Sequence, residues 1–414
     1  MNHTGRWALG GFGALVLLVA TPGCSTPRER SLALIFPSSV VTPETSQTTP
    51  DATPTTVETV ETVPGTAAEV QSSTETTTAA TDPTGVASGS WVDATEGLAG
   101  LSSECGNMAL VSARPDRPGL IASVALQGLW AADAGEGTWT RIGTSGAPIT
   151  NRGTSIVYDP DHPDTFWESG VYNGGGVYRT DDNGLTFRQL GSVSHTEGVS
   201  VDFTDPLRAT LLATKHEAAT ISLSTDGGAT WQDLTATFPG DIGYATGPVV
   251  IDSTTFVLGT SHGDGSGVFR STDGGRSWVS VFSGGVSGRP LITADGAIYW
   301  VLESTNQIIT SDDNGATWAV VNADDSGAPR ATSLIELPGG VFAALGDTAI
   351  IESSDEGRTW RTVGPPLPFA PAGMTYSAAA EAFYVWRFDC DFSTDDPIQP
   401  DSIMRLTATS DLAH

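Results

Sequence analysis

The chain has 414 residues and a formal net charge of -29, from 48 acidic and 19 basic side chains. Such an acidic surface repels phosphate backbones and anionic membranes, so no nucleic acid partner is expected, and membrane contact is expected only through a lipid anchor. The length exceeds that of a small module and fits a large domain with an N-terminal extension.

Residues 1–24 predict a secretory signal. Arg6 precedes the apolar run 7–20 and the sequence Thr21-Pro22-Gly23-Cys24, a segment too short and wrongly flanked for a lasting membrane span. Cys24 after a small residue resembles the cleavage box of bacterial lipoproteins, in which this cysteine becomes the lipidated N-terminus. The resemblance implies a lipoprotein on the extracellular face of the bacterial membrane, and plain secretion is the alternative.

Residues 25–87 predict a disordered stalk. The chain from Pro37 to about Ser88 is rich in Thr, Pro, Ser, Val and Glu, and it has no Lys or Arg. Such a composition cannot bury enough apolar surface to offset the conformational entropy of the chain. The stalk, with or without O-glycosylation, is expected to hold the folded part, residues 88–414, away from the cell envelope.

One eight-residue pattern recurs through residues 180–360: Ser or Thr, any residue, Asp, any residue, Gly, any residue, Ser or Thr, and an aromatic residue. Its copies contain Asp182, Asp226, Asp273, Asp313 and Asp355. The spacing, about 40 to 47 residues, is the size of one four-stranded β-propeller blade. The residue types suit a hairpin corner, because Asp and the hydroxyl bond locally, Gly supplies positive φ, and the aromatic packs on a neighbouring blade. These aspartates are therefore predicted to be structural.

The repeats predict an all-β fold, a seven-bladed β-propeller. Short runs of Val, Ile, Leu, Phe and Tyr alternate with Gly, Asp and Pro turns, without a helical period of useful length. A degenerate copy of the pattern, one residue too long, covers Asp133–Trp139 in the first blade. The blades are expected at about 107–142, 153–190, 196–236, 244–282, 288–321, 330–363 and 372–408.

The last blade lacks a fourth strand of its own. Residues 90–95 align with the outer strand that follows the other copies of the pattern, so we expect them to complete this blade. Such a join removes an open sheet edge and closes the ring. Cys105 and Cys390 then lie in loops on one face, where a disulfide would pin the closure in an oxidising compartment. Two unpaired thiols are the alternative.

With these five corners, residues 107–409 resemble the Asp-box, or bacterial neuraminidase repeat, propellers. That superfamily includes sialidases, sortilin-type receptors, xyloglucan hydrolases and the photosystem II assembly factor, so the resemblance specifies a fold and not an activity. It implies that ligands bind on the face opposite the corners, in loops between outer and inner strands and between second and third strands. Candidate binding residues in these loops are Arg152, Glu168, Tyr172, His195, Glu197, His216, Glu217, Tyr244, His262, Asp264, Arg289, Glu303, Arg330 and Arg387.

The sialidase catalytic set is not matched residue by residue. Sialidases clamp a sugar carboxylate with three arginines and use a Tyr with a Glu, and an Asp as general acid/base. The first arginine of that set lies in an aromatic-Arg-Ile-Pro motif, whereas Arg114–Pro118 looks like an inter-strand turn. Arg289, Arg330 and Arg387 differ from the set in order and flanks, so no catalytic role is carried over.

No metal site or cofactor is predicted. Asp181–Gly184 and Asp312–Gly315 resemble calcium loops but belong to the recurring corner, and His195 with His216 lacks a third zinc ligand. We expect a monomeric, cell-surface or secreted module that binds an extracellular glycan or protein without turnover. The alternative is a sialidase-like glycoside hydrolase that uses two carboxylates, drawn from Glu168, Glu197, Glu217, Asp264 and Glu303.

Overall fold

The computed structural model describes residues 89–98, 101, 108–133, 138–240, 242–321, 333–387 and 402–407. The predicted signal and stalk, the centre of the degenerate corner, Cys24, Cys105, Cys390 and Arg330 lie outside these residues. Within the described ranges the chain is almost entirely β, with one 3-10 turn at Thr235–Thr237. No helix in this part of the chain is long and apolar enough to cross a membrane.

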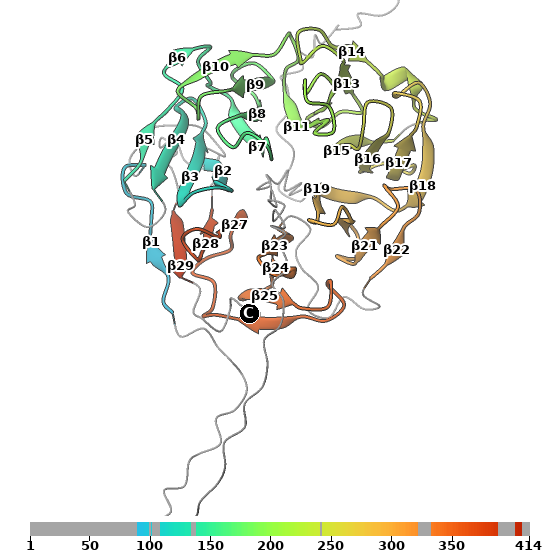
Figure 1. Ribbon diagram of the computed structural model, residues 1–414. Helices are drawn as coiled ribbons and strands as arrows, with labels where there is room; N and C mark the ends of the chain where they lie inside the picture. The colour runs from blue at the N-terminus through green and yellow to red at the C-terminus, as the bar shows by residue number, and fades with distance from the viewer. Residues whose placement is uncertain are drawn as a thin grey trace, which may run out of the picture. The chain divides into compact units, whose positions relative to one another are not determined.

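Seven sheets stand side by side in a ring, and each is an antiparallel meander whose first strand lies nearest the middle (Figure 1). The first blade contains β2 (Met108–Ala113), β3 (Gly119–Val124), β4 (Gly128–Asp133) and β5 (Thr140–Arg141). The second contains β7 (Arg152–Tyr158), β8 (Phe166–Val171), β9 (Val177–Thr180) and β10 (Thr186–Gln189). The third contains β11 (Thr196–Val201), β12 (Leu211–Lys215), β13 (Ile221–Ser224) and β14 (Gln232–Asp233).

The remaining sheets continue around the ring in the same order. The fourth blade contains β15 (Tyr244–Val250), β16 (Phe256–Ser261), β17 (Gly267–Ser271) and β18 (Val279–Ser283). The fifth contains β19 (Val286–Ile292), β20 (Ile298–Leu302), β21 (Ile308–Ser311) and β22 (Ala319–Val320). The sixth contains β23 (Ile335–Leu337), β24 (Val341–Leu345), β25 (Ile350–Ser353) and β26 (Arg361–Val363). The seventh contains β27 (Gly373–Ser377), β28 (Ala382–Trp386), β29 (Ile403–Thr407) and β1 (Val92–Asp93). The fold is a seven-bladed β-propeller, as the sequence predicts.

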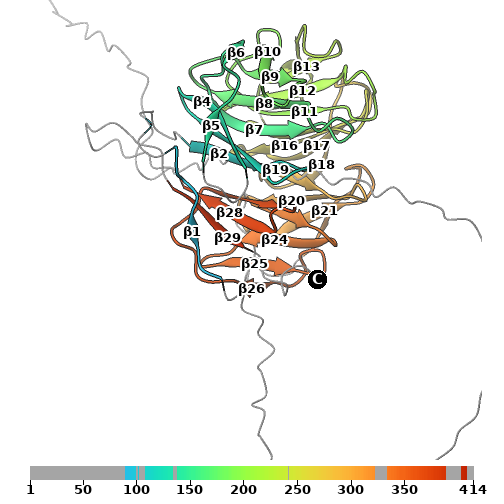
Figure 2. The same cartoon turned by 60° about the vertical axis from the view of Figure 1, so that its left-hand side comes forward.

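The N-terminal strand completes the last blade. β1 pairs antiparallel with β29, with Val92 opposite Arg405, and it runs beside that strand in both views (Figures 1 and 2). The pairing continues past the strand, since Ala94 N–H donates to the Ile403 carbonyl at 2.9 Å. Trp139 of the first blade donates from Nε1 to the Ala94 carbonyl at 2.8 Å. The predicted closure is therefore confirmed, and it is tied to the first blade.

The hydrophobic core is divided among the blade interfaces. Each sheet lies between two others, so both faces of its inner strands are buried, as in β2, β3 and β8. Seven clusters of buried apolar residues each span one pair of adjacent blades. Between blades 4 and 5, for example, Val257 packs with Trp300. Removal of one blade would expose two apolar faces, so the ring is stable only when complete.

The five corners repeat one hydrogen-bond pattern. In the third blade, Ser224 Oγ donates to Asp226 Oδ1 at 2.8 Å and accepts Gly228 N–H at 2.9 Å. Thr230 donates its N–H to Oδ1 at 2.9 Å and its hydroxyl to Oδ2 at 2.6 Å. Hydrogen bonds to the carboxylate lower the pKa of Asp226 to about 2, and the bond from the Thr230 hydroxyl contributes most to this shift. The carboxylate thus organises its own turn.

Each corner also packs against the preceding blade. The corner aromatic Trp278 lies in the cluster between blades 3 and 4, and its Nε1 donates to Thr237 Oγ1 at 3.1 Å. Gly275, with φ of 79°, lies so close to this blade that an added Cβ would be 2.4 Å from Leu234 Cδ1. The predicted pattern therefore needs Gly both for its backbone conformation and for the close approach.

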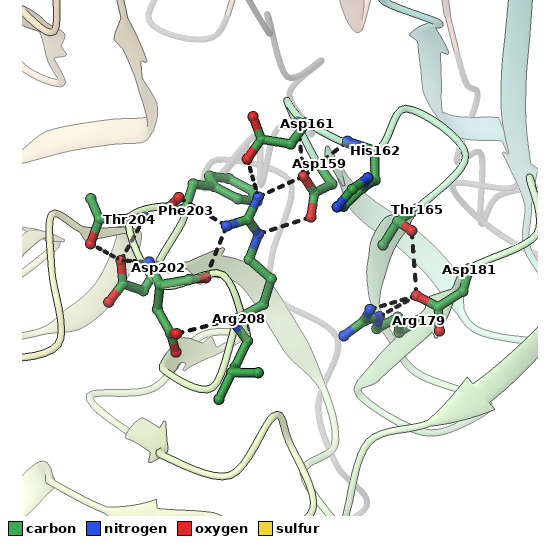
Figure 3. Close-up of polar contacts among 12 residues, drawn as sticks. Asp159, Asp161, His162, Thr165, Arg179, Asp181, Asp202, Phe203, Thr204 and Arg208 are labelled. Atoms are coloured by element: carbon green, nitrogen blue, oxygen red, sulfur yellow. Dashed lines mark hydrogen bonds and ion pairs between the residues drawn. The ribbon is translucent and has the colours of Figure 1, made fainter.

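A buried arginine joins the second and third blades near the corners (Figure 3). Arg208 Nε and Nη2 bind Asp159 at 2.9 Å each, and Nη2 also binds Asp161 at 2.5 Å. Nη1 donates to the carbonyls of Phe203 and Asp205, at 2.9 and 2.8 Å. All the nitrogens of this guanidinium are engaged, and the Asp159 side chain is only 1% exposed. The fork geometry of arginine suits such a buried carboxylate.

One strand departs from the four-stranded expectation. β6 (Ser145–Gly146), in the connection from the first to the second blade, pairs parallel with β10 as a fifth strand. Gly146 has φ of 85°, and an added Cβ there would be 2.5 Å from the Phe187 carbonyl oxygen. A short connection with glycine at the contact can thus cover the outer edge of this blade.

Candidate functional site

The antiparallel meander sorts the turns onto two faces of the ring. Turns after the first and third strands of a blade lie on one face, which we call the corner face because it carries the five aspartate corners. Connections after the second and fourth strands lie on the other, which we call the opposite face. Most of the candidate binding residues belong to the opposite face, where two groups of them are in contact.

The Tyr172 cluster consists of Arg152, Tyr172, His195, Glu197 and His216, from the second and third blades. The Tyr172 hydroxyl lies 3.0 Å from His216 Nε2, and His216 Nδ1 contacts a carboxylate oxygen of Glu197. An ionised carboxylate only accepts, so Nδ1 donates its proton to Glu197, and in the neutral imidazole Nε2 accepts the phenol proton. The cluster thus contains a carboxylate, an imidazole and a phenol in series.

Ring contacts and backbone strain fix Tyr172 in place. The rings of His195 and His216 meet it edge on, with centroids 5.7 and 5.5 Å away. Tyr172 and His195 have φ of 57° and 52°, in the left-handed region that such residues rarely adopt. Strain of this kind is common at ligand sites. Tyr172 nevertheless remains 37% exposed, and Glu217, whose Oε1 lies 3.7 Å from His216 Nε2, is exposed beside it.

Arg152 is the buried cation of this cluster. It is the first residue of β7, not a loop residue as expected, and its Cζ lies 5.0 Å from the centroid of the Tyr172 ring. Contact between a guanidinium and an aromatic face is favourable because the ring face carries negative charge density. The residue is 9% exposed, and its Nε is buried without a hydrogen-bond partner in the described part of the chain.

Glu168 lies in β8 and not in the loop that the sequence predicts. Its side chain is 0% exposed. Alternate residues of a strand point to the same side, so Glu168, two residues after Phe166, faces the first blade as Phe166 does. Asn151 Nδ2 donates to its Oε2 at 3.4 Å, while Oε1 has no partner among the described residues. Burial raises the pKa of Glu168 to about 8. This carboxyl cannot contact a ligand directly.

The His262 cluster consists of Tyr244, His262 and Glu303, on the fourth and fifth blades. His262 Nε2 lies 3.1 Å from Glu303 Oε1, and its ring lies 5.1 Å from that of Tyr244. Its Nδ1 is 2.9 Å from Ser261 Oγ. Tyr244 is 37% exposed, so an accessible aromatic ring, a histidine and a carboxylate again lie together.

Asp264 lies outside both clusters, in a separate cleft. The cleft has a volume of about 630 Å³ and is bordered by the 263–266 loop and by β18, the outermost strand of the fourth blade. Phe269 and Trp278 form its apolar wall. Asp264 is therefore beside the candidate surface and not part of either contact group.

The arginines suggested as a carboxylate clamp are separated. Arg289 lies within β19 and not in a loop, and its Nη2 donates to the Val199 carbonyl of β11 at 3.1 Å. It thus links the fifth and third blades, and burial lowers its pKa to about 10. Arg387 packs over Phe369, 5.2 Å from the ring centroid. Arg330 lies outside the described residues.

Ser261 and Phe369 were not among the predicted binding residues, although Ser261 contacts His262 and Phe369 contacts Arg387. Ser261 directly precedes His262 in the sequence, and this adjacency was the available signal. Phe369 comes from the connection between blades 6 and 7 and has no such signal. In the described ranges, no group of three or more His, Cys, Asp or Glu side chains is placed to hold a metal ion.

Comparison with known proteins supports the same architecture. No family model matches the chain, and no curated protein matches it in sequence. Solved structures do match. Virginiamycin B lyase from Staphylococcus aureus has a TM-score of 0.53 and 13% identity, over 78% of this chain and 99% of that one. Oligogalacturonate lyase in complex with manganese has a TM-score of 0.52 and 11% identity, over 79% and 95%.

A third similar structure is YCF48 bound to a D1 peptide, with a TM-score of 0.47, 16% identity and coverage of 77% and 97%. The chain is a β-propeller. At these identities the likeness concerns the fold, and propellers support many unrelated functions. Function must therefore be argued from the residues of the opposite face.

Proposed function

We propose that the opposite face binds an extracellular glycan. The observation that carries this proposal is the exposed Tyr172 ring, held by His195 and His216 with Glu197 behind them. An aromatic face offers apolar contact to a sugar ring, and a few placed polar groups orient its hydroxyls. Tyr244 with His262 and Glu303 repeats this combination on the fourth and fifth blades.

Binding without hydrolysis fits the described carboxylates better than a glycosidase does. Hydrolysis needs two carboxyl groups that face one sugar bond. Here Glu197 and Glu303 each contact a histidine, and Glu217 lies near His216. Glu168 has the raised pKa that a general acid requires, but it is enclosed between the first two blades. We therefore rank glycoside hydrolysis below binding.

A second candidate function rests on the series formed by Glu197, His216 and Tyr172. A carboxylate that orients an imidazole, which in turn contacts a hydroxyl, is the arrangement that enzymes use to move a proton. The series would then act as a general base on a bound sugar. Its signature would be a chemically altered glycan after incubation with the protein, lost in a His216→Asn variant.

We also propose a family, a cellular location and an oligomeric state for this protein. The recurring corners support kinship with the Asp-box propellers, and Cys24 supports lipid attachment outside a bacterial cell. The stalk would then hold a monomeric ring away from the envelope, and a Cys105–Cys390 disulfide would pin its closure. Mass spectrometry of the secreted chain can test the lipid and the disulfide, and light scattering can test the monomeric state.

The test is a glycan array probed with the purified full chain and with a Tyr172→Ala/Tyr244→Ala variant. We expect the wild-type protein to retain a defined set of glycans and the variant to lose them, because the two exposed rings would make the contact. Unchanged retention by the variant would place binding elsewhere. Chemical change of the retained glycans would replace binding by the enzymatic candidate.

A matched control comes from the corner face. Leu207 is 79% exposed in the turn between β11 and β12, so a Leu207→Ala variant also removes an exposed apolar side chain. We expect it to bind as the wild type does. If no glycan is retained by any form, a protein ligand becomes the better reading of this face.

A further inference from the structure

Arg152 differs from the two other arginines that are buried in the described ranges, Arg114 and Arg208. Arg114 donates from Nη1 to the Asn183 side-chain oxygen. Arg208 has its guanidinium nitrogens engaged by carboxylates and carbonyls. Arg152, though 91% buried by its exposed fraction of 9%, has no hydrogen bond or ion pair within the described ranges, and its Nε is enclosed. Its one described contact is with the ring of Tyr172.

A buried cation without an anion is costly. Removing a guanidinium from water forfeits its hydration, and proteins normally replace that with a carboxylate or several carbonyls. The Tyr172 ring offsets only part of this cost, because a cation–π contact is weaker than a charge-assisted hydrogen bond. A bound anion would supply what the described protein groups do not.

We propose that Arg152 receives the carboxylate of an acidic sugar, so that the glycan bound beside Tyr172 is a carboxylated one. This inference rests on the proposed glycan-binding function and narrows its ligand class. A carboxylate is planar and accepts parallel N–H bonds from a guanidinium, which suits a site with little open surface. The sugar ring that carries it would lie against the exposed part of Tyr172.

The overall charge of -29 does not oppose such a local site. At physiological ionic strength charges are screened over about 8 Å, so a ligand at Arg152 responds mainly to its immediate surroundings. Those surroundings include the Tyr172 ring, and His195 lies against that ring with centroids 5.7 Å apart. Glu197, the carboxylate of the same cluster, is held by His216.

The experiment compares one sugar with and without its charge. Isothermal titration of the full chain with an oligogalacturonate and with its methyl ester keeps the sugar constant and removes the carboxylate. We expect the acid to bind at least about tenfold more tightly than the ester. An Arg152→Met variant should lose this preference, so that it binds acid and ester with similar affinity, while Arg152→Lys should retain part of the preference.

The control is Arg276→Met on the corner face. Arg276 is exposed and bonds only within its own turn, through Nη1 to the Asp273 carbonyl at 2.9 Å, so this variant changes the net charge equally. It should keep the full preference. Thermal unfolding of each variant verifies that Arg152→Met is folded. If Arg152→Met is unfolded, the preference for the acid is measured with Arg152→Lys instead.

The possible results separate the two proposals. Equal binding of acid and ester by the wild type, or an unchanged preference in Arg152→Met, would overturn the anion site and leave glycan binding intact. No binding of any array glycan would overturn both. A preference for sialosides over their esters, lost in Arg152→Met, would support the same anion site with a different carboxylated sugar.

Discussion

The two faces of this ring use the same polar residue types in opposite ways. On the corner face, Asp226 and its equivalents bond to their own turns, and Arg208 has a partner for each guanidinium nitrogen. On the opposite face, Arg152 Nε is buried without a described partner, and the Tyr172 ring that it contacts remains 37% exposed. Arg208 thus uses its charge to hold two blades together, whereas the charge of Arg152 remains available to a ligand.

The largest effect should come from breaking the scaffold at Arg208. An Arg208→Met substitution leaves the Asp159 carboxylate, 1% exposed, without its partner, and should lower the free energy of unfolding by roughly 3–5 kcal/mol. Urea denaturation of both proteins measures this. A loss as small as that of Arg276→Met, which should stay within about 0.5 kcal/mol, would show that the bonds of Arg208 to the buried Asp159 do not stabilise the scaffold as described.

A smaller effect on the free energy of unfolding is expected from Glu168, and it should depend on pH. Its folded pKa of about 8 lies above the ordinary 4.5, so the folded state holds a proton that the unfolded state has released between these values. The free energy of unfolding should therefore fall as pH rises from about 4.5 to 8, by a few kcal/mol, and level off above that.

The matched variant is Glu168→Gln, which keeps the shape and removes the titration. Its stability, measured by urea denaturation at intervals between pH 5 and 8, should vary less with pH than that of the wild type. Parallel curves for the two proteins would mean that Glu168 is solvated and ionised, contrary to its enclosed position.

The smallest effect separates two glycines of one corner. Gly275→Ala combines positive φ with a Cβ 2.4 Å from Leu234, whereas Gly274→Ala has φ of 73° and only Ser253 O at 3.9 Å. Backbone strain alone should cost about 1 kcal/mol at either position, and the contact adds about 1–3 kcal/mol at Gly275. Equal melting temperatures for the two variants would contradict packing of the corner against the preceding blade.

Sequence reasoning succeeded where the chemistry is contiguous. A corner such as Ser224–Trp231 carries all its bonding partners within eight residues, so its turn could be predicted from residue types and spacing. The closing strand at Val92 was also recoverable, because it repeats a strand seen elsewhere in the chain. The repeat made the pairing of β1 with the distant β29 predictable, because the residues of β1 resemble the outer strands of other blades.

The remaining features depend on which residues the closed ring brings together. Glu168 looks like a loop carboxylate in sequence, and only the alternation within β8 places it against the first blade. Arg289 reaches Val199 from two blades away, which no local pattern reports. A meeting of His195 with His216 was expected, but the position of the Tyr172 ring in contact with both was not.

Closure by β1 and β29 also sets an order of events during synthesis. The strand that leaves the ribosome first among the blades pairs with the one that leaves last, more than 300 residues later, as the Val92–Arg405 pairing requires. The outer edge of the last blade therefore stays unfinished until almost the whole chain exists. A chain that ends before β29 would leave the edges of β1 and β28 unpaired. Only a chain that includes β29 can therefore close the ring.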